Sequence, residues 1–175
     1  FGGSLKKEIF KREGYAVYEQ AHAIYNQFSE IRYFIDENKF KEMKRFELNS
    51  GDLIMSCSGT MGKVAIVPTN IKRGIINQAL LKLIPSQKIL NVFLKFWMES
   101  ESFQNSSKMY SQGAAIQNVV SVKILKEIKL ALPPIPLQQK FASLVERVEK
   151  LRGKQRESEK ELENLFQSLM QRYFG

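Results

Sequence analysis

The stretch Gly51-Asp52-Leu53-Ile54-Met55-Ser56-Cys57-Ser58-Gly59-Thr60-Met61-Gly62-Lys63-Val64-Ala65-Ile66-Val67 decides the fold of this chain. It consists of two short apolar runs joined by a loop, residues 58–63, that contains two glycines. This arrangement predicts a strand–loop–strand unit. Small residues in the loop let its backbone come close to a partner, and Thr60 and Lys63 offer hydrogen-bond donors.

Further strands and short helices are predicted on both sides of this unit. Candidate strands lie at residues 15–20, 30–35, 53–58, 63–67, 75–84 and 127–132. Asp36 is expected to cap a short helix at 37–45, and apolar residues with helical spacing predict another at 91–102. The mixture predicts an α+β domain with a twisted, mostly antiparallel sheet and short helices.

The chain changes character at Leu132-Pro133-Pro134-Ile135-Pro136. Prolines stiffen the chain at the start of a helix, and no further proline follows. We therefore predict a globular domain at residues 1–132 and a long coiled-coil-forming helix at 133–175.

Apolar residues of this helix repeat with the alternating spacing of three and four that is typical of a coiled coil. We call them the seam: Phe141, Leu144, Val148, Leu151, Leu162, Leu165 and Leu169. Gln155 and Ser158 interrupt it at two core positions, where a polar residue can set register. A single helix cannot cover such a stripe, so the seam needs its own domain, a second copy or another protein.

Composition narrows the classes of partner. The 175 residues carry a net charge of +9, which favours a polyanion over a neutral ligand. No apolar run approaches the roughly 20 residues of a membrane span, so no membrane is expected as a partner. A lone cysteine excludes an internal disulfide and fits a reducing, cytoplasmic compartment. The start, Phe1-Gly2-Gly3-Ser4, has no methionine and is typical of a fragment boundary.

Catalytic and metal sites find little support. His22 and Cys57 could form an imidazole–thiol pair, but neither lies in a motif that supports one. Gly59-Thr60-Met61-Gly62-Lys63 is an incomplete phosphate loop, because Val64 stands where a hydroxyl residue would bind magnesium. No metal-ligand spacing is present. We expect a non-catalytic chain without cofactor or metal.

DNA binding fits the residues better. Arginine can pair with guanine, asparagine and glutamine with adenine, and basic groups with phosphates. The candidates for DNA contact are Tyr18, Gln20, Tyr25, Asn26, Arg32, Tyr33, Lys39, Lys41, Lys44, Arg45, Thr60, Lys63, Lys72 and Arg73. Alternatively, the charged clusters form an ordinary solvated surface and the tyrosines pack on the core.

Several phrases, in order along the chain, resemble the specificity subunits of type I DNA restriction–modification enzymes. They are Gly14-Tyr15-Ala16-Val17-Tyr18-Glu19-Gln20, residues 51–67, Ile76-Asn77-Gln78-Ala79-Leu80, Gly113-Ala114-Ala115-Ile116-Gln117-Asn118-Val119 and residues 128–139. The resemblance implies a non-catalytic subunit that reads double-stranded DNA. Separate methyltransferase and restriction subunits would use S-adenosylmethionine and ATP.

The usual family member has two recognition domains and two spacer helices that pair antiparallel, whereas this chain resembles half a subunit. Either a second half is missing or two copies pair about a two-fold axis, which would make the DNA target palindromic. Two alternatives stay open. The chain could be the specificity region of a fused restriction–methylation enzyme, or a helical assembly protein that does not bind DNA.

Overall fold

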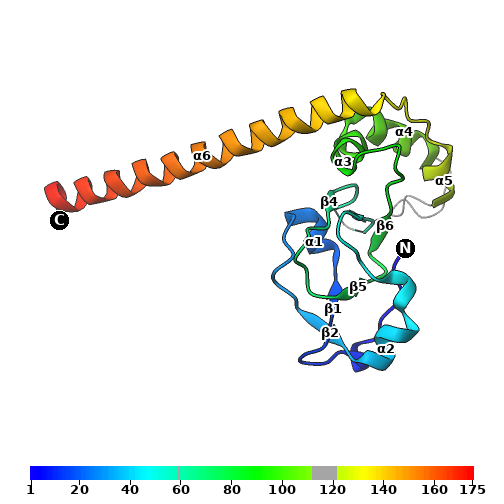
Figure 1. The fold of residues 1–175 in the computed structure, drawn as a ribbon. Coiled ribbons are helices and arrows are strands. Elements are labelled where there is room, and N and C mark those ends of the chain that lie inside the picture. The colour runs from blue at the N-terminus through cyan, green and yellow to red at the C-terminus, as the bar shows by residue number, and fades with distance from the viewer. Residues whose placement is uncertain (59, 112–121) are drawn as a thin grey trace. The chain divides into compact units, whose positions relative to one another are not determined.

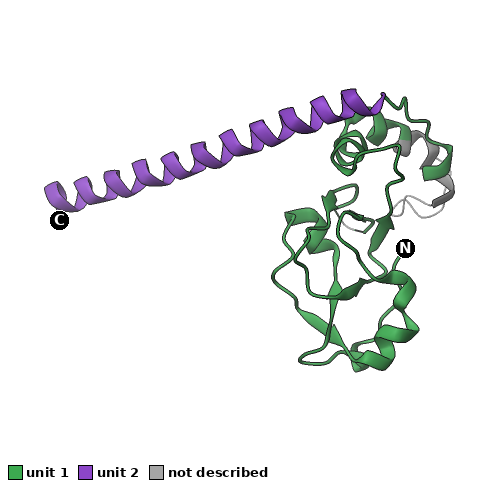
Figure 2. Ribbon diagram, in the orientation of Figure 1, with its two compact units in different colours: residues 1–133 green, residues 134–175 purple. Residues whose placement is uncertain are grey.

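The computed structural model describes residues 1–58, 60–111 and 122–175. These residues fall into two compact units, Phe1–Pro133 and Pro134–Gly175, which Figure 2 colours separately. The first unit holds all the strands of the described residues, and the second is a single helix. The α+β class and the long C-terminal helix are confirmed.

The strands of the first unit form two three-stranded sheets rather than one (Figure 1). One has the order β2-β1-β5, with β1 antiparallel to β2 and parallel to β5. The other, β4-β3-β6, is fully antiparallel. The strands are β1 (Tyr15–Tyr18), β2 (Tyr33–Ile35), β3 (Leu53–Ser56), β4 (Val64–Ile66), β5 (Gly74–Ile76) and β6 (Leu80–Leu83).

Strand β3 is buried on both faces, which explains its unbroken run of apolar residues. Ile54 belongs to a core cluster that also contains Tyr18 and Ile76 of the other sheet and Ala23 of α1 (Gln20–Tyr25). Leu53 and Met55 face the opposite way, toward Met98 and Phe103. The strand–loop–strand unit predicted from residues 51–67 is therefore the centre of the fold.

Helices and 3-10 turns complete the two units. They are η1 (Lys7–Ile9), α1, α2 (Glu37–Glu42), η2 (Lys44–Phe46), α3 (Asn91–Glu99), α4 (Glu101–Ser111), α5 (Val122–Glu127) and α6 (Ile135–Phe174). Phe40 of α2 packs with Val17 and Ile75 on the outer face of the first sheet. Asp36 caps α2 as predicted, since its carboxylate accepts from the Lys39 amide at 2.9 Å.

Four predicted elements need correction. Residues 75–84 form two strands in different sheets, because a turn at Asn77, whose side chain accepts from the Ala79 amide, separates them. The helix predicted at 91–102 breaks at Ser100, which is extended with ψ 152°. The helix predicted at 37–45 ends at Glu42. The strand predicted at 127–132 is wrong: Glu127 ends α5, and residues 128–132 form neither helix nor strand. The phrase at 113–119 lies outside the described residues.

Candidate nucleic-acid interface

The segment between α1 and β2 presents the most concentrated set of polar and aromatic side chains. Asn26 ends α1 with φ 50°, a left-handed conformation that asparagine tolerates. Beyond it, the Gln27 side chain accepts from the Glu30 amide at 3.3 Å and donates to Ser29 Oγ at 3.1 Å. These bonds hold the loop backbone in a defined shape.

His22 connects the residue before α1 to the segment that follows α1. Its Nδ1 lies 2.9 Å from the Glu19 amide nitrogen, and its Nε2 lies 3.1 Å from the Glu30 carbonyl oxygen. Nδ1 also lies 3.0 Å from the Glu19 carbonyl oxygen, so the ring bridges backbone groups of Glu19 and Glu30. His22 is buried against the Tyr18 and Phe28 rings. It acts as a structural tie, with no contact to Cys57 among the described interactions.

A pocket of about 680 Å³ opens beside this tie. Its lining includes His22, Tyr25, Gln27, Glu30 and Arg32. Tyr25 is 76% exposed. The structure thus brings together Tyr25 and Arg32, two candidates that the sequence places seven positions apart. Glu19 and Glu30 also line the pocket, and the sequence analysis did not single them out.

Arg32 is supported by a stack of aromatic rings. Its guanidinium carbon lies 4.8 Å from the centroid of the Tyr33 ring. The Tyr33 ring in turn stacks on Phe10, with centroids 4.3 Å apart and planes inclined by 17°. Phe10 was missed by the sequence analysis, because its contact with Tyr33 joins residues far apart in the chain. Tyr33 itself is half-buried and serves as this support.

Tyr18 is a correction to the predicted DNA contacts. Its side chain is 0% exposed, and its hydroxyl donates to the Lys72 carbonyl oxygen at 2.5 Å. A buried phenol with a satisfied hydroxyl cannot reach a base. Neighbouring Gln20 is half-buried, and among the described residues its Oε1 atom is buried without a hydrogen-bond partner.

Some of the predicted phosphate-binding groups pair with a carboxylate, and others do not. Lys39 pairs with Glu42 and Lys41 with Glu37, each at 2.9 Å. Arg73 pairs with Glu47 at 2.6 Å, and this hydrogen bond raises the pKa of its guanidinium. The bond to Glu37 likewise raises the pKa of Lys41. A phosphate would have to compete with a carboxylate at these three positions.

The remaining basic candidates are exposed and have no carboxylate partner within the described part of the chain. Lys44 lies on η2 beside Arg45, whose guanidinium lies over the Phe46 ring at 4.5 Å. The Lys72 ammonium lies 4.6 Å from the centroid of Phe34. These three and Lys63 are the cations most available to a polyanion.

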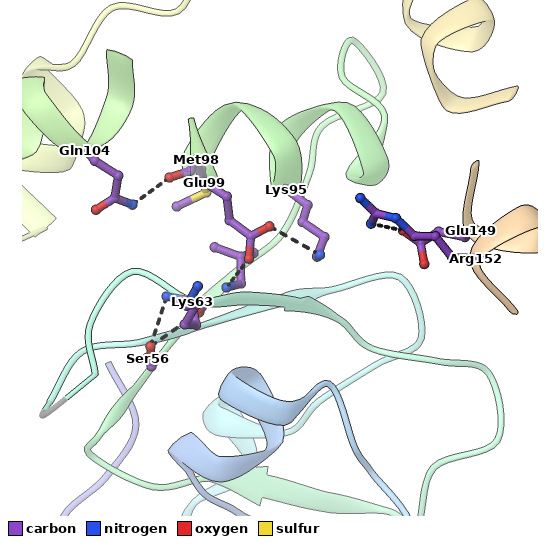
Figure 3. Close-up of polar contacts among 9 residues, drawn as sticks. Ser56, Lys63, Lys95, Met98, Glu99, Gln104, Glu149 and Arg152 are labelled. Carbon is purple, nitrogen blue, oxygen red and sulfur yellow. Dashed lines mark hydrogen bonds and ion pairs between the residues drawn. The ribbon is translucent and has the colours of Figure 1, made fainter. Parts of the chain in front are cut away.

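The loop between β3 and β4 is held by Ser56, whose side chain is buried (Figure 3). Ser56 Oγ donates to the Thr60 carbonyl at 2.6 Å and accepts from the Lys63 amide at 3.1 Å. Gly62 turns with φ 77°, and a Cβ there would lie 2.8 Å from the Gln104 amide nitrogen. Thr60 and Lys63 are exposed, as a DNA contact requires.

Strand β4, which follows the loop, is hydrogen-bonded to α3. The Val64 amide donates to Glu99 Oε1 at 3.1 Å, and the other Glu99 oxygen accepts from Lys95 at 3.3 Å (Figure 3). In α4, the Gln104 side chain donates to the Met98 carbonyl at 2.8 Å. The hairpin is therefore anchored at both strands, while Thr60 and Lys63 face solvent.

The described residues show no arrangement suited to metal binding or to thiol chemistry. Within them, no group of three or more His, Cys, Asp or Glu side chains could hold a metal ion. Cys57 is buried and its thiol donates to the Met55 carbonyl at 3.4 Å. None of the helices described is both long enough and apolar enough to span a bilayer.

Two buried acidic groups predict a loss of stability at alkaline pH. Burial raises the pKa of the Cys57 thiol to about 11 and that of the Tyr18 phenol to about 12. In an unfolded chain these groups ionise near about 8.5 and 10. Their contribution to stability is therefore complete below the unfolded values and is lost as the pH rises toward the folded ones.

We expect the urea midpoint, followed by the fluorescence of Trp97, to fall between about pH 8.5 and 11. In Cys57→Ala the urea midpoint should fall less over the same pH range, because the variant has no thiol to ionise. An equal fall in the variant would contradict the assignment to Cys57.

In the second unit, the seam lies along one face of α6 and is largely exposed. Leu151 is 65% exposed, Leu162 67% and Leu165 57%. Leu144, Val148 and Leu169 are also exposed, whereas Phe141 is half-buried. An apolar stripe of this length in contact with water is typical of a helix that pairs with another helix.

Comparisons with known proteins agree with one another. The type I restriction modification DNA specificity domain family matches residues 2–164. The specificity subunit of the type I restriction enzyme EcoBI from Escherichia coli is 27% identical over 124 residues, which is 70% of this chain and 25% of that protein.

Two solved structures share the fold. The HsdS subunit from Thermoanaerobacter tengcongensis matches with a TM-score of 0.66 and 16% identity over 99% of this chain and 41% of that one. A chain from a study of assembly of the type I R-M system matches with a TM-score of 0.68 and 16% identity, over 97% of this chain and 41% of that one. The chain thus spans less than half the length of these proteins. It belongs to the type I restriction modification DNA specificity domain family.

Proposed function

We propose that the first unit reads one half-site of a double-stranded DNA target in the major groove. The observation that carries this proposal is the pocket beside the α1–β2 segment, which is lined by Tyr25 at the end of α1 and by a stacked Arg32 just before β2. Lys44, Lys63 and Lys72 are exposed and have no carboxylate partner among the described residues, and they would contact phosphates. The net charge of +9 would favour the encounter.

In this proposal the chemistry belongs to other subunits. A methyltransferase with S-adenosylmethionine and an ATP-dependent restriction subunit would act on DNA that this chain selects, in the cytoplasm. The chain would be the non-catalytic recognition component, with no cofactor of its own. The family membership supports this division of labour, and α6 offers an exposed face on which such subunits could dock.

Binding to a panel of random duplexes at two salt concentrations tests the reading of sequence. We expect a subset of duplexes to stay bound at the higher concentration, because base contacts do not release counterions as phosphate contacts do. Retention should be measured by gel shift, with and without the methyltransferase subunit of the same system. Uniform weak binding that disappears with salt in both arms would contradict the proposal.

We further propose that the seam of α6 pairs with the seam of a second copy of this chain. Charge along the helix supports an antiparallel arrangement. Residues 140–156 contain six Lys or Arg and two Glu, whereas residues 157–172 contain four Glu and two Lys or Arg. Parallel helices would place like charges together, and antiparallel helices would place the basic half against the acidic half.

The apolar pattern supports the same arrangement with one particular register. If Gln155 faces Ser158 of the second copy, Leu151 faces Leu162 and Val148 faces Leu165. Leu144 then faces Leu169, so six of the seven seam residues meet apolar partners and the two polar residues meet each other, while Phe141 faces Arg172. The two-fold axis would pass between Arg156 and Glu157, where the charge along the helix also reverses. Two domains related in this way would read a palindromic target.

A further inference from the structure

The guanidinium of Arg32 is unpaired, in contrast to several of the basic groups proposed to meet DNA. Lys39, Lys41 and Arg73 each pair with a carboxylate at 2.9 Å or less. Among the described residues, Arg32 has no carboxylate partner, and its guanidinium lies over the Tyr33 ring at 4.8 Å. Arg45 lies over the Phe46 ring in the same way, but it is on η2, outside the α1–β2 segment. Its hydrogen-bonding groups are therefore available to a ligand.

The support beneath Arg32 restricts its motion. Tyr33 is the first residue of β2, and its ring stacks on Phe10 at 4.3 Å. A flat guanidinium on a fixed ring keeps its fork of N–H groups in one plane and loses less side-chain entropy on binding. Such a group suits a planar acceptor pair better than a phosphate, which any flexible lysine can contact.

The surrounding backbone is equally constrained. His22 joins Glu19 to the Glu30 carbonyl at 3.1 Å, two residues before Arg32. The Gln27 side chain accepts a hydrogen bond from the Glu30 amide. The pocket that Arg32 lines also contains the ring of Tyr25, which is 76% exposed. A rigid site with one free fork and one exposed aromatic ring has the chemistry of a base reader.

We propose that Arg32 determines specificity by donating two hydrogen bonds to the O6 and N7 atoms of one guanine in the half-site. This inference rests on the proposed function, since it requires that the domain reads DNA bases. Among the side chains of the α1–β2 segment, Arg32 alone has the fork that matches guanine in the major groove. Lys44, exposed and without a supporting ring, would contact phosphate and contribute equally to every sequence.

Selection from a randomised duplex library, followed by sequencing, tests this assignment with the full chain. The variants are Arg32→Lys, which keeps the charge and removes the fork, Arg32→Ala, and the control Lys44→Ala. Wild type is expected to require guanine at one position or more. Both Arg32 variants should lower the preference for guanine at one position by about 10- to 100-fold and leave the other positions unchanged. Lys44→Ala should weaken binding to all sequences alike.

The outcomes separate this inference from the proposed function. If wild type selects no sequence, base reading itself is refuted and the role of Arg32 with it. If wild type selects a sequence and both Arg32 variants select the same one, only the role of Arg32 is refuted. If Arg32→Ala weakens binding to all sequences equally and Arg32→Lys restores the affinity, Arg32 contacts a phosphate. That outcome would also refute its role in reading guanine. Arg32 is exposed, so circular dichroism and melting temperature should match those of wild type.

Discussion

Leu162→Asp and Leu165→Asp are each expected to turn a self-associating chain into monomers. In the proposed register these residues face Leu151 and Val148 of the second copy, and a carboxylate there would be buried without a partner. Burying an unpaired charge costs several kcal/mol, enough to raise the dissociation constant by about 100-fold or more. Sedimentation equilibrium measures the change in mass directly.

Asn164→Asp is the matched control. It adds the same charge on the same helical turn but lies off the seam. Its mass should stay that of wild type. The first unit should keep its fold in all three variants, because Leu162 and Leu165 are exposed and belong to the other unit. A dimer that survives both seam substitutions would contradict the proposed pairing.

The orientation of the helices can be tested with the same chain. Mixed Leu151→Cys and Leu162→Cys chains should form a disulfide-linked pair under oxidation, whereas Leu151→Cys alone should not. In the antiparallel register, the two copies of residue 151 lie about 16 Å apart along the helix axis at 1.5 Å per residue. The native Cys57 is buried and should not interfere. Efficient linkage of Leu151→Cys alone would indicate parallel helices.

Gly74→Ala is expected to destabilise the first unit by about 3 kcal/mol. Gly74 begins β5 and pairs with Ala16 of β1 in the parallel part of the first sheet. A Cβ at this position would lie 2.2 Å from the Ala16 carbonyl oxygen and 2.7 Å from the Ala16 Cβ. These are backbone atoms and a methyl group of a central strand, so the clash can be relieved only by moving β1 and β5 apart.

Urea unfolding followed by Trp97 fluorescence measures this effect, because Trp97 is the only tryptophan and lies on α3 of the first unit. Gly153→Ala serves as the control. A Cβ on Gly153 meets nothing within 4 Å, and alanine favours a helix by about 1 kcal/mol over glycine. The control should therefore leave the fluorescence midpoint unchanged and increase helix content. Equal midpoints for Gly74→Ala and wild type would contradict the close approach of β1 and β5.

The local sequence pattern was sufficient to predict the long helix and the central hairpin. The seam, the prolines at 133, 134 and 136 and the helix formers beyond them predicted α6, because a helix depends on residues a few positions apart. The two apolar runs around Ser58–Lys63 likewise predicted β3 and β4. Pattern failed at residues 75–84, where the spacing of apolar residues suggested one strand and hid the turn at Asn77 that sends β5 and β6 to different sheets.

Some properties of the candidate site follow from the sequence, and others follow only from the tertiary structure. The sequence alone supplied the chemistry of the α1–β2 segment, the excess of positive charge and the seam, since all three follow from residue type and spacing. Only the tertiary structure decided that Tyr18 is buried, that Arg73 pairs with Glu47, and that Arg32 rests on the Tyr33 ring, which stacks on Phe10. Burial and pairing join residues far apart in the chain, and no local spacing encodes which of them meet.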